Sequence, residues 1–257
     1  MIRTWLDMSP TGVFAVLIVL YFGMTLLLAA ITFLRPFARP VQSLTGVVAP
    51  FFSGVAILFG LLTGFLANDV AERGRQAYRV VQTEAGELHN IHTLSVASAS
   101  DMRTIRAALK TYLTSVVVEE WPAMDEMRLS PITEAAYDAL LREVSAPSIA
   151  KESGQAVHSA LLTATLRVGT TRNDRLALSS DHTNDLKWLA VIVLGLLTQI
   201  AIALVHLEKP RAFLASLAVF ASAAVVALGM IALQEYPFDG TFQVSPAPIK
   251  ALQSLSD

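Results

Sequence analysis

The side chains best suited to chemistry in this sequence are carboxylates and histidines of its polar middle part. The carboxylates are Glu84, Glu87, Glu119, Glu120, Asp125 and Glu126. Two carboxylates can share acid–base work when a cleft holds them together. Here they fall on segments with helical spacing of apolar residues, so we expect them in solvated or salt-bridged positions on a helix bundle, where single charges contribute little.

The two histidines, His89 and His92, are three residues apart on a predicted helix and therefore share a face. With Glu84 or Glu87 nearby they could ligate a metal ion. They lack the four-residue spacing and the general base of the zinc-protease helix, and we interpret them as surface histidines. The chain has no cysteine, no Gly-rich phosphate loop and no nucleophile elbow. We therefore expect no enzyme, no metal and no cofactor.

Four long apolar runs dictate the elements that must position these side chains. They are residues 11–34, 47–67, 186–207 and 212–233. Each is long enough to cross the hydrocarbon core of a bilayer as a helix, and the only charge within them is Lys187 at an edge. The sequence therefore predicts an all-α membrane protein, with four transmembrane helices as two hairpins flanking a helical extramembrane bundle. The lipid bilayer is the expected partner, and a net charge of −2 does not suggest nucleic acid.

The predicted domains are an N-terminal hairpin (1–67), a helical domain (68–185), a C-terminal hairpin (186–233) and a tail (234–257). No helix-breaking residue lies between Gly64 and Gly74, so the second apolar helix should continue into the helical domain.

Within the helical domain, Trp121-Pro122 is expected to end a helix and Ser130-Pro131 to begin the next. A further helix is predicted from Ala150 to about Leu178, and residues 249–255 should form a short helix at the membrane surface.

The second apolar helix has two distinct faces. Gly60 and Gly64 have the small-xxx-small spacing that permits close helix packing. The other face carries aromatic and branched residues. The candidate pore-lining residues are Phe52, Val55, Phe59 and Thr63. An apolar pore face can gate by constriction or dewetting, with Phe52 and Phe59 at successive levels; the alternative is packing against helices or lipid.

A further set of residues is spread through the polar middle and the tail. It comprises Glu84, Tyr112, Glu120-Trp121-Pro122, Arg172, Arg175 and Pro237-Phe238-Asp239-Gly240. With these elements in this order, the chain resembles the bacterial bestrophin-like domain family over nearly its whole length. Structural roles, such as a buried ring at Trp121 or a tail anchor at Phe238, are the alternative interpretation of the same residues.

Bestrophins themselves are pentameric anion channels with two helices, a helical soluble part and two more helices. The resemblance therefore implies a homo-oligomer, a pentamer by analogy, that conducts a small anion. The acidic run of the bestrophin calcium clasp is missing here, so calcium gating is not implied. The rival hypothesis is a membrane-anchored sensor or scaffold whose helical domain binds a partner.

Two geometric expectations follow from the charges. Arg172 and Arg175 return toward the membrane where Glu84 leaves it, so at least one ion pair should join these segments near the membrane surface.

The short loops between paired apolar runs are basic. They carry Arg35, Arg39, Lys209 and Arg211 against Glu208. Basic loops favour the cytoplasm, which places the helical domain outside a bacterial inner membrane; the bestrophin analogy implies the reverse.

Overall fold

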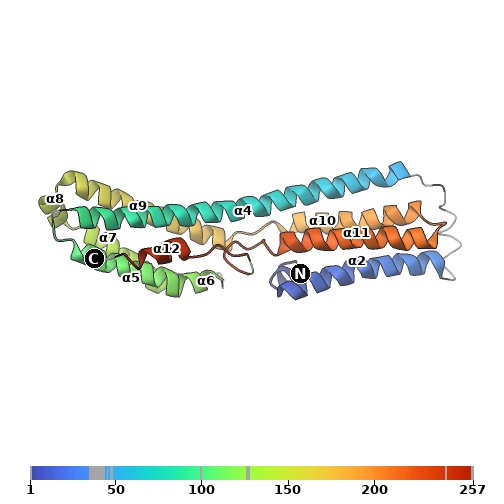
Figure 1. Ribbon diagram of the computed structural model, residues 1–257, viewed down its shortest axis with the longest axis horizontal. Helices are drawn as coiled ribbons and strands as arrows, with labels where there is room; N and C mark the ends of the chain where they lie inside the picture. The colour runs from blue at the N-terminus through green and yellow to red at the C-terminus, as the bar shows by residue number, and fades with distance from the viewer. Residues whose placement is uncertain are drawn as a thin grey trace. The chain divides into compact units, whose positions relative to one another are not determined.

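The computed structural model describes residues 2–34, 44, 46, 49–98, 100–125, 128–240 and 242–255. Within these residues every regular element is a helix and no strand occurs, which confirms the all-α class (Figure 1). The long helices are α2 (Pro10–Phe33), α4 (Ala49–Ala97), α9 (Gln155–Ser180), α10 (Asp185–Val205) and α11 (Pro210–Ala232). The shorter ones are α1 (Ile2–Leu6), α5 (Arg103–Ser115), α6 (Trp121–Asp125), α7 (Pro131–Val144), α8 (Pro147–Ser153) and α12 (Ala247–Leu252).

The chain divides into two compact units. The first, here called the membrane unit, comprises Met1–Glu72 and Thr183–Glu235. The second, the polar unit, comprises Arg73–His182 and Tyr236–Asp257. Helix α4 begins in the membrane unit and continues without interruption into the polar unit, as the absence of a helix breaker predicts.

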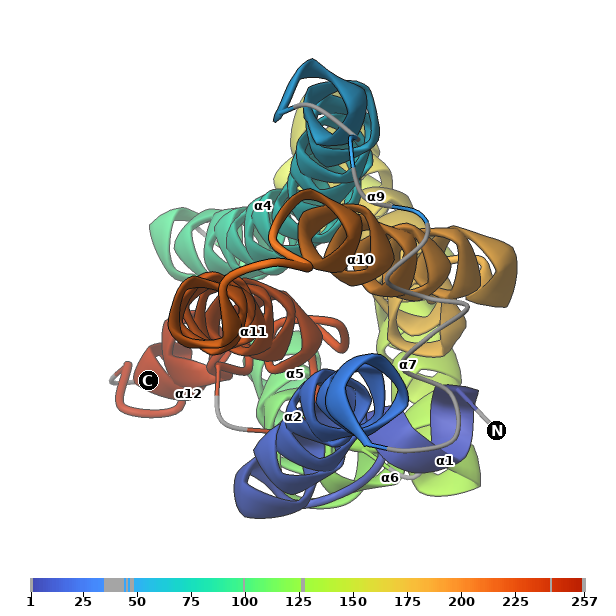
Figure 2. The same cartoon turned by 90° about the vertical axis from the view of Figure 1, so that its right-hand side faces the viewer.

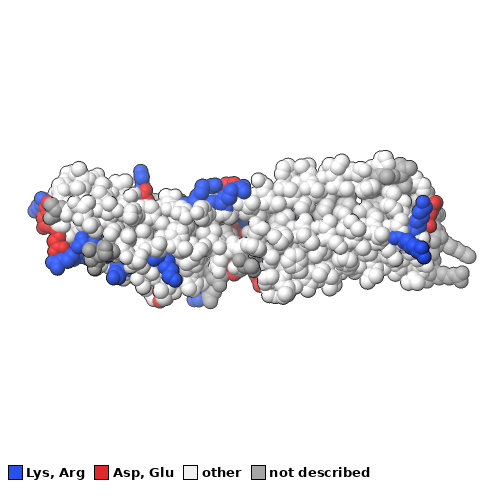
Figure 3. Space-filling view, in the orientation of Figure 1, with Lys and Arg blue, Asp and Glu red and all other residues white. Residues whose placement is uncertain are grey.

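The membrane unit is built on α2, α10 and α11, which lie side by side (Figure 2). Their outer faces carry exposed apolar side chains such as Val19, Leu26 and Val219, each more than two-thirds exposed. On the face seen in Figure 3, the surface over this unit carries no charge along most of its length, with Lys, Arg, Asp and Glu only at its ends. Among the described residues, four helical stretches are long and apolar enough to cross a membrane, and each overlaps one of the four predicted runs.

The polar unit has a conventional apolar core. Residues of α4, α5, α7 and α9 contribute Leu88, Ile105, Leu140 and Leu161, all fully buried. The C-terminal tail completes this core, because Ile249 of α12 is also fully buried within it. The short helix expected in the tail is present as α12, although it begins two residues earlier than predicted. Its apolar side packs against this core, and Gln253 Nε2 donates to the backbone oxygen of Leu113 at 3.2 Å. Its placement at the membrane surface stays a prediction.

Two local expectations also need correction. Trp121-Pro122 does not end a helix, because a π-helical turn, Val116–Glu120, joins α5 directly to α6. The wider turn shifts the backbone hydrogen bonds to a five-residue spacing, which makes room for the proline ring. The helix predicted from Ala150 is divided by Gly154, whose φ of 85° no helical residue adopts. By contrast, Ser130-Pro131 does begin α7, with Ser130 Oγ accepting from the Thr133 backbone N–H.

Candidate functional site: a buried network of ion pairs

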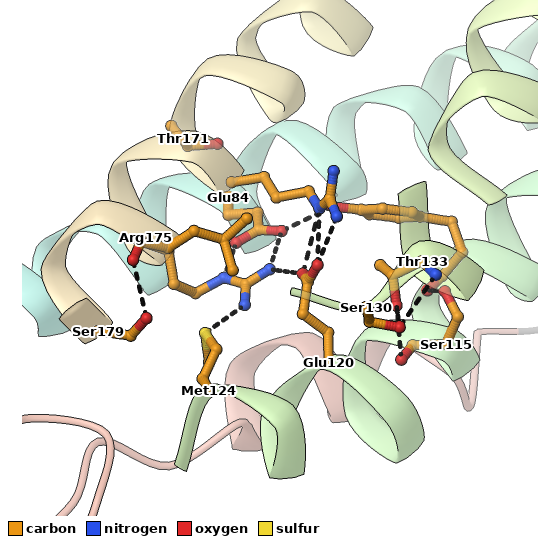
Figure 4. A network of polar contacts seen from close by, with 12 residues as sticks. Glu84, Ser115, Glu120, Met124, Ser130, Thr133, Thr171, Arg175 and Ser179 are labelled. Carbon is orange, nitrogen blue, oxygen red and sulfur yellow. Dashed lines mark hydrogen bonds and ion pairs between the residues drawn. The ribbon is translucent and has the colours of Figure 1, made fainter. Parts of the chain in front are cut away.

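Arg175 is the centre of a buried ion-pair network in the polar unit (Figure 4). Its guanidinium spans two carboxylates: Nε lies 2.7 Å from Glu84 Oε2, and Nη2 lies 3.1 Å from Glu84 Oε1 and 2.7 Å from Glu120 Oε2. All three side chains are 0% exposed. The paired contact to Glu84 is the two-pronged geometry that makes arginine a strong partner for a carboxylate.

Arg172, one helical turn earlier on α9, extends the network toward the surface. Its Nε donates to Glu120 Oε1 at 2.9 Å and its Nη1 to Glu134 Oε2 at 2.6 Å. Arg172 is 3% exposed, whereas Glu134 is 62% exposed. The network therefore has a closed interior and one carboxylate that reaches solvent.

Neutral groups occupy the remaining polar positions. The Tyr112 hydroxyl donates to Glu84 Oε1 at 2.9 Å, and Met124 Sδ lies 3.1 Å from Arg175 Nη1. The Trp121 ring lies 5.2 Å from the Arg175 guanidinium in a cation–π contact. Phe238 of the tail packs edge-on against Trp121, with ring centres 5.7 Å apart.

The electrostatics of this cluster are balanced. Two arginines face Glu84 and Glu120 in the interior, with Glu134 at the rim. Burial alone would lower the pKa of the Arg175 guanidinium, but the charge and hydrogen bonds of Glu84, joined by Glu120, raise it well above its usual range. Burial, together with the charge of Glu84, raises the pKa of Tyr112 well above that of a free tyrosine. The Arg175 guanidinium therefore stays charged and the Tyr112 hydroxyl stays neutral throughout the physiological range.

The π-helical turn explains how one chain segment supplies so many inward groups. Tyr112, Val116, Glu120 and Met124 follow at four-residue steps, and all are at most 2% exposed. In an α-helix, residues four apart differ in direction by about 40° around the helix axis. After three such steps the last side chain would point well away from the first. The extra width of the π-turn, closed by the Trp121 N–H donating to the Val116 oxygen, keeps them on one face.

The family-motif residues thus come together in space, from four separate parts of the sequence. Pro237 closes the tail turn, since its backbone oxygen accepts from the Val244 N–H at 2.7 Å, and Gly240 adopts a φ of 81°. The predicted cross-helix ion pair is confirmed as Arg175–Glu84. Its location near the membrane surface stays a prediction.

The expected salt-bridged role is confirmed for Glu84 and Glu120, although both are fully buried instead of lying on a solvated surface. Glu119 is exposed, as expected. Glu134 was missed, and Met124, although part of the segment that resembles the family, was not among the candidate site residues. Glu134 follows the Ser130-Pro131 helix start, where an acidic residue is explained by the helix dipole alone, so the sequence offered no sign of its second role. The Asp125 side chain and Glu126 lie outside the described residues.

The candidate pore-lining residues Phe52, Val55, Phe59 and Thr63 are half-buried within the membrane unit. Phe59 packs against Phe220 of α11, with ring centres 5.4 Å apart, and Phe52 lies against the core that contains Phe213 and Leu217. Their assignment to a pore stays a prediction, and in a single chain they face inward.

The two glycines of the small-xxx-small pattern lie on the exposed side of α4, unlike the half-buried candidate pore-lining residues. Gly60 and Gly64 are exposed, and nothing lies within 4 Å of the point where a Cβ would stand. Helix packing at this face stays a prediction, and any helix that packs there comes from outside the described chain.

The histidines do not assemble a metal site. His89 is exposed, with a ring nitrogen 3.5 Å from Thr93 Oγ1. Across the part of the chain that the structure describes, no three His, Asp or Glu side chains are grouped closely enough to hold an ion. Each charged group of the network contacts a group of opposite sign. This arrangement suits stabilisation of the fold better than it suits proton transfer.

Fold and network together define an all-α membrane protein of bestrophin-like architecture, and comparison with known proteins gives the family. The bestrophin-like domain matches residues 19–249, so the chain belongs to the bestrophin-like domain family. No curated protein matches the chain.

Several solved structures share the fold. A single-substitution variant of a bacterial bestrophin homologue from Klebsiella pneumoniae gives a TM-score of 0.67 at 14% identity, covering 93% of this chain and 96% of that one. The same homologue solved by Zn-SAD phasing gives 0.66 at 12% identity, covering 93% and 95%. A membrane-protein variant gives 0.68 at 11% identity, also covering 93% and 95%. At such identities the likeness establishes the fold alone.

Proposed function

We propose that this chain is one subunit of an oligomeric ion channel that passes small anions through a bacterial inner membrane. The α2–α4 and α10–α11 pairs would form the two membrane hairpins, with the polar unit outside the bilayer. The bestrophin-like fold supports this proposal, and bestrophins supply the analogy for anions and for a pentamer. The proposal includes no enzymatic step.

The observation that carries the proposal is the exposed face of α4 in the membrane unit. Ile57, Leu61, Gly64 and Asn68 are all exposed, and at about 100° per residue they lie within about 60° of one another around the helix. No charged residue occurs from Phe52 to Asn68. A ring of copies needs such a face, because the side chains that line its axis must be left uncovered by their own subunit.

This face is roughly opposite the one that carries Phe59. We therefore propose Ile57 and Leu61 as the apolar constriction, with Phe52, Val55, Phe59 and Thr63 as the competing assignment. Gly60 and Gly64, at the edge of the exposed face, would let the α4 helix of a neighbouring copy approach closely.

Ion flux from liposomes containing the purified protein tests both assignments. We expect chloride efflux above that of empty liposomes, with little potassium efflux. Leu61→Ala should widen the constriction and raise the flux, whereas Phe59→Ala should leave flux near the wild-type value. The reverse ranking would assign the pore to the aromatic face, and a stable oligomer without flux of either ion would refute the channel.

A second candidate, a scaffold whose polar unit binds a partner, is favoured by one observation. A groove of about 470 Å³ lies along α5, the π-helical turn and the start of α7. Its lining is apolar and hydroxyl-bearing, as at Thr111, Val118 and Ile132, with the charged Lys110 and Glu119 among it. Val118 and Ile132 are 58% and 59% exposed, which is unusual for branched apolar residues outside the apolar helices. A stable monomer in detergent, with no flux, would favour this role.

A further inference from the structure

A groove in the membrane unit is apolar along most of its length and charged at one end, as a phospholipid is. It lies between α4 and α10, has a volume of about 450 Å³ and is apolar over most of its length. The apolar lining consists of Leu62, Phe65, Leu66, Leu186, Ala190 and Val191. Asp69 and Lys187, which complete the lining, form an ion pair with each other and are 39% and 58% exposed. The groove therefore has an apolar body and one charged end.

The charged end coincides with the point at which both helices stop being apolar. Asp69 is the first charged residue on α4 after Ala49, and α10 has no charged residue after Lys187. Two indole rings are found at the same level: Trp188 follows Lys187 and packs edge-on against Trp5, with ring centres 5.3 Å apart. Charges that flank an apolar helix, with tryptophans beside them, mark the headgroup level of a bilayer. The apolar part of the groove then lies at the depth of the acyl chains.

The charges at this end select among lipids. Lys187 supplies a cation for a phosphate, but Asp69 beside it repels a second negative charge. The nearby pair of Arg3 and Asp185, with Nε and Oδ1 4.0 Å apart, adds one charge of each sign, and Glu72 stands one turn beyond Asp69. A headgroup with both a phosphate and a cation complements this pattern better than an anionic headgroup does.

We propose that the groove binds a phospholipid with a primary-amine headgroup, of the phosphatidylethanolamine class. One acyl chain lies against Leu62, Leu66 and Ala190. The phosphate accepts a hydrogen bond from the Lys187 ammonium, which has three donors and uses one on Asp69. The lipid ammonium donates to Asp69. This site is independent of the channel proposal, because it needs only the membrane insertion of α4 and α10.

Native mass spectrometry of the full-length protein in detergent, titrated with defined lipids, tests the proposal. Phosphatidylethanolamine should bind more tightly than phosphatidylglycerol, which lacks the cation, and than phosphatidylcholine, whose cation has no N–H donor. Loss of a charge-assisted hydrogen bond should weaken binding by about tenfold in Lys187→Gln. Lys209→Gln, at the α10–α11 turn, removes the same charge far from the groove in sequence and should leave binding unchanged.

Ala190→Trp provides an independent test of the apolar part. Ala190 is exposed, so the larger ring fills the groove without entering the protein core, and phosphatidylethanolamine binding should fall while Lys187 is intact. Equal binding of all three lipids, or equal loss in the Lys187 and Lys209 variants, would overturn the proposal. So would disulfide formation between copies of an Ala190→Cys variant in membranes, because a second copy would then cover the groove. The lipid ranking on the unmodified chain decides the question even if a variant fails to fold.

Discussion

Arg175 and Glu84 are 91 residues apart in the chain, yet the Nε of the arginine donates to the Oε2 of the glutamate across 2.7 Å in a wholly buried contact. This pair joins α9 to α4, and Glu120 connects the same arginine to the π-helical turn. Three segments of the polar unit are thus fixed to one guanidinium. The four charged groups of the interior are satisfied by one another, and that completeness makes the loss of any one of them costly.

Replacement of Arg175 by methionine should therefore lower the free energy of unfolding by about 3–5 kcal/mol, because Glu84 would lose its ion pair with Arg175 and Glu120 would keep only its pair with Arg172, both in buried positions. Thermal unfolding in detergent, followed by circular dichroism, measures the loss. Arg167→Met is the matched control on the same helix: Arg167 is 67% exposed and pairs with Glu87 at 3.2 Å, so its loss should cost about 1 kcal/mol or less. Equal effects of the two substitutions would mean that the buried pairs contribute no more than a surface pair.

The raised pKa of Tyr112 predicts a specific alkaline instability. Because burial and Glu84 keep the folded hydroxyl protonated, the unfolded chain releases this proton first as the pH rises above 10. The unfolded state then binds fewer protons than the folded state, so stability falls with rising pH, by about 1.4 kcal/mol per pH unit for this group. The contribution is fully present below pH 10.

Comparison of wild type with Tyr112→Phe isolates the contribution of the Tyr112 hydroxyl to the pH dependence of stability, because all other titrating groups are common to both proteins. The variant should lose stability near neutral pH through the missing hydrogen bond to Glu84, but its stability should decline less steeply between pH 10 and pH 11. Chemical denaturation at several pH values measures both slopes. Parallel slopes would show that Tyr112 titrates normally in the folded protein.

Gly195 of α10 should tolerate no side chain. A Cβ at this position would stand 2.2 Å from Tyr21 Oη and 3.0 Å from two ring carbons, so α2 and α10 would have to separate. We expect Gly195→Ala to cost about 1–3 kcal/mol, the usual penalty of overpacking. Adding Tyr21→Phe should restore part of the loss by removing the nearest atom. Gly64→Ala, which meets nothing within 4 Å in the chain, should leave the unfolding temperature of the monomer unchanged.

The sequence was informative about the membrane helices and much less so about the network. Apolar runs of transmembrane length can hardly form anything else, so α2, α10 and α11 were predictable to within a few residues. Glu119 and Glu120, in contrast, are neighbours of the same type, yet one is exposed and the other fully buried. Neighbouring residues of any helix point about 100° apart, so residue type alone could not decide which of the two faces the core.

A similar ambiguity affected the faces of α4. Apolar periodicity identifies which residues share a face but not whether that face meets its own chain, another copy or lipid. Phe52 and Phe59 were plausible pore residues by type; within the single chain Phe59 packs against Phe220, and a pore-lining role stays a prediction. The exposed face includes Gly64, which sequence reasoning assigned to helix packing, and Ile57 and Leu61, to which it assigned no role.

The orientation in the membrane is the last prediction. Lys209 and Arg211 in the turn between α10 and α11 outnumber Glu208, and basic short loops favour the cytoplasm. Arg35 and Arg39, which lie outside the described residues, add to the same side. The polar unit, between the second and third membrane helices, should then be extracytoplasmic, although the bestrophin analogy implies a cytosolic position.

Single cysteines decide between these orientations, because the chain has none of its own. Glu208 and Ser148 are both exposed, one in the α10–α11 turn and one in the polar unit. In intact cells an impermeant thiol reagent should label Ser148→Cys but not Glu208→Cys, and detergent should render both reactive. Labelling of Glu208→Cys alone would reverse the orientation, place the polar unit in the cytoplasm and agree with the bestrophin analogy.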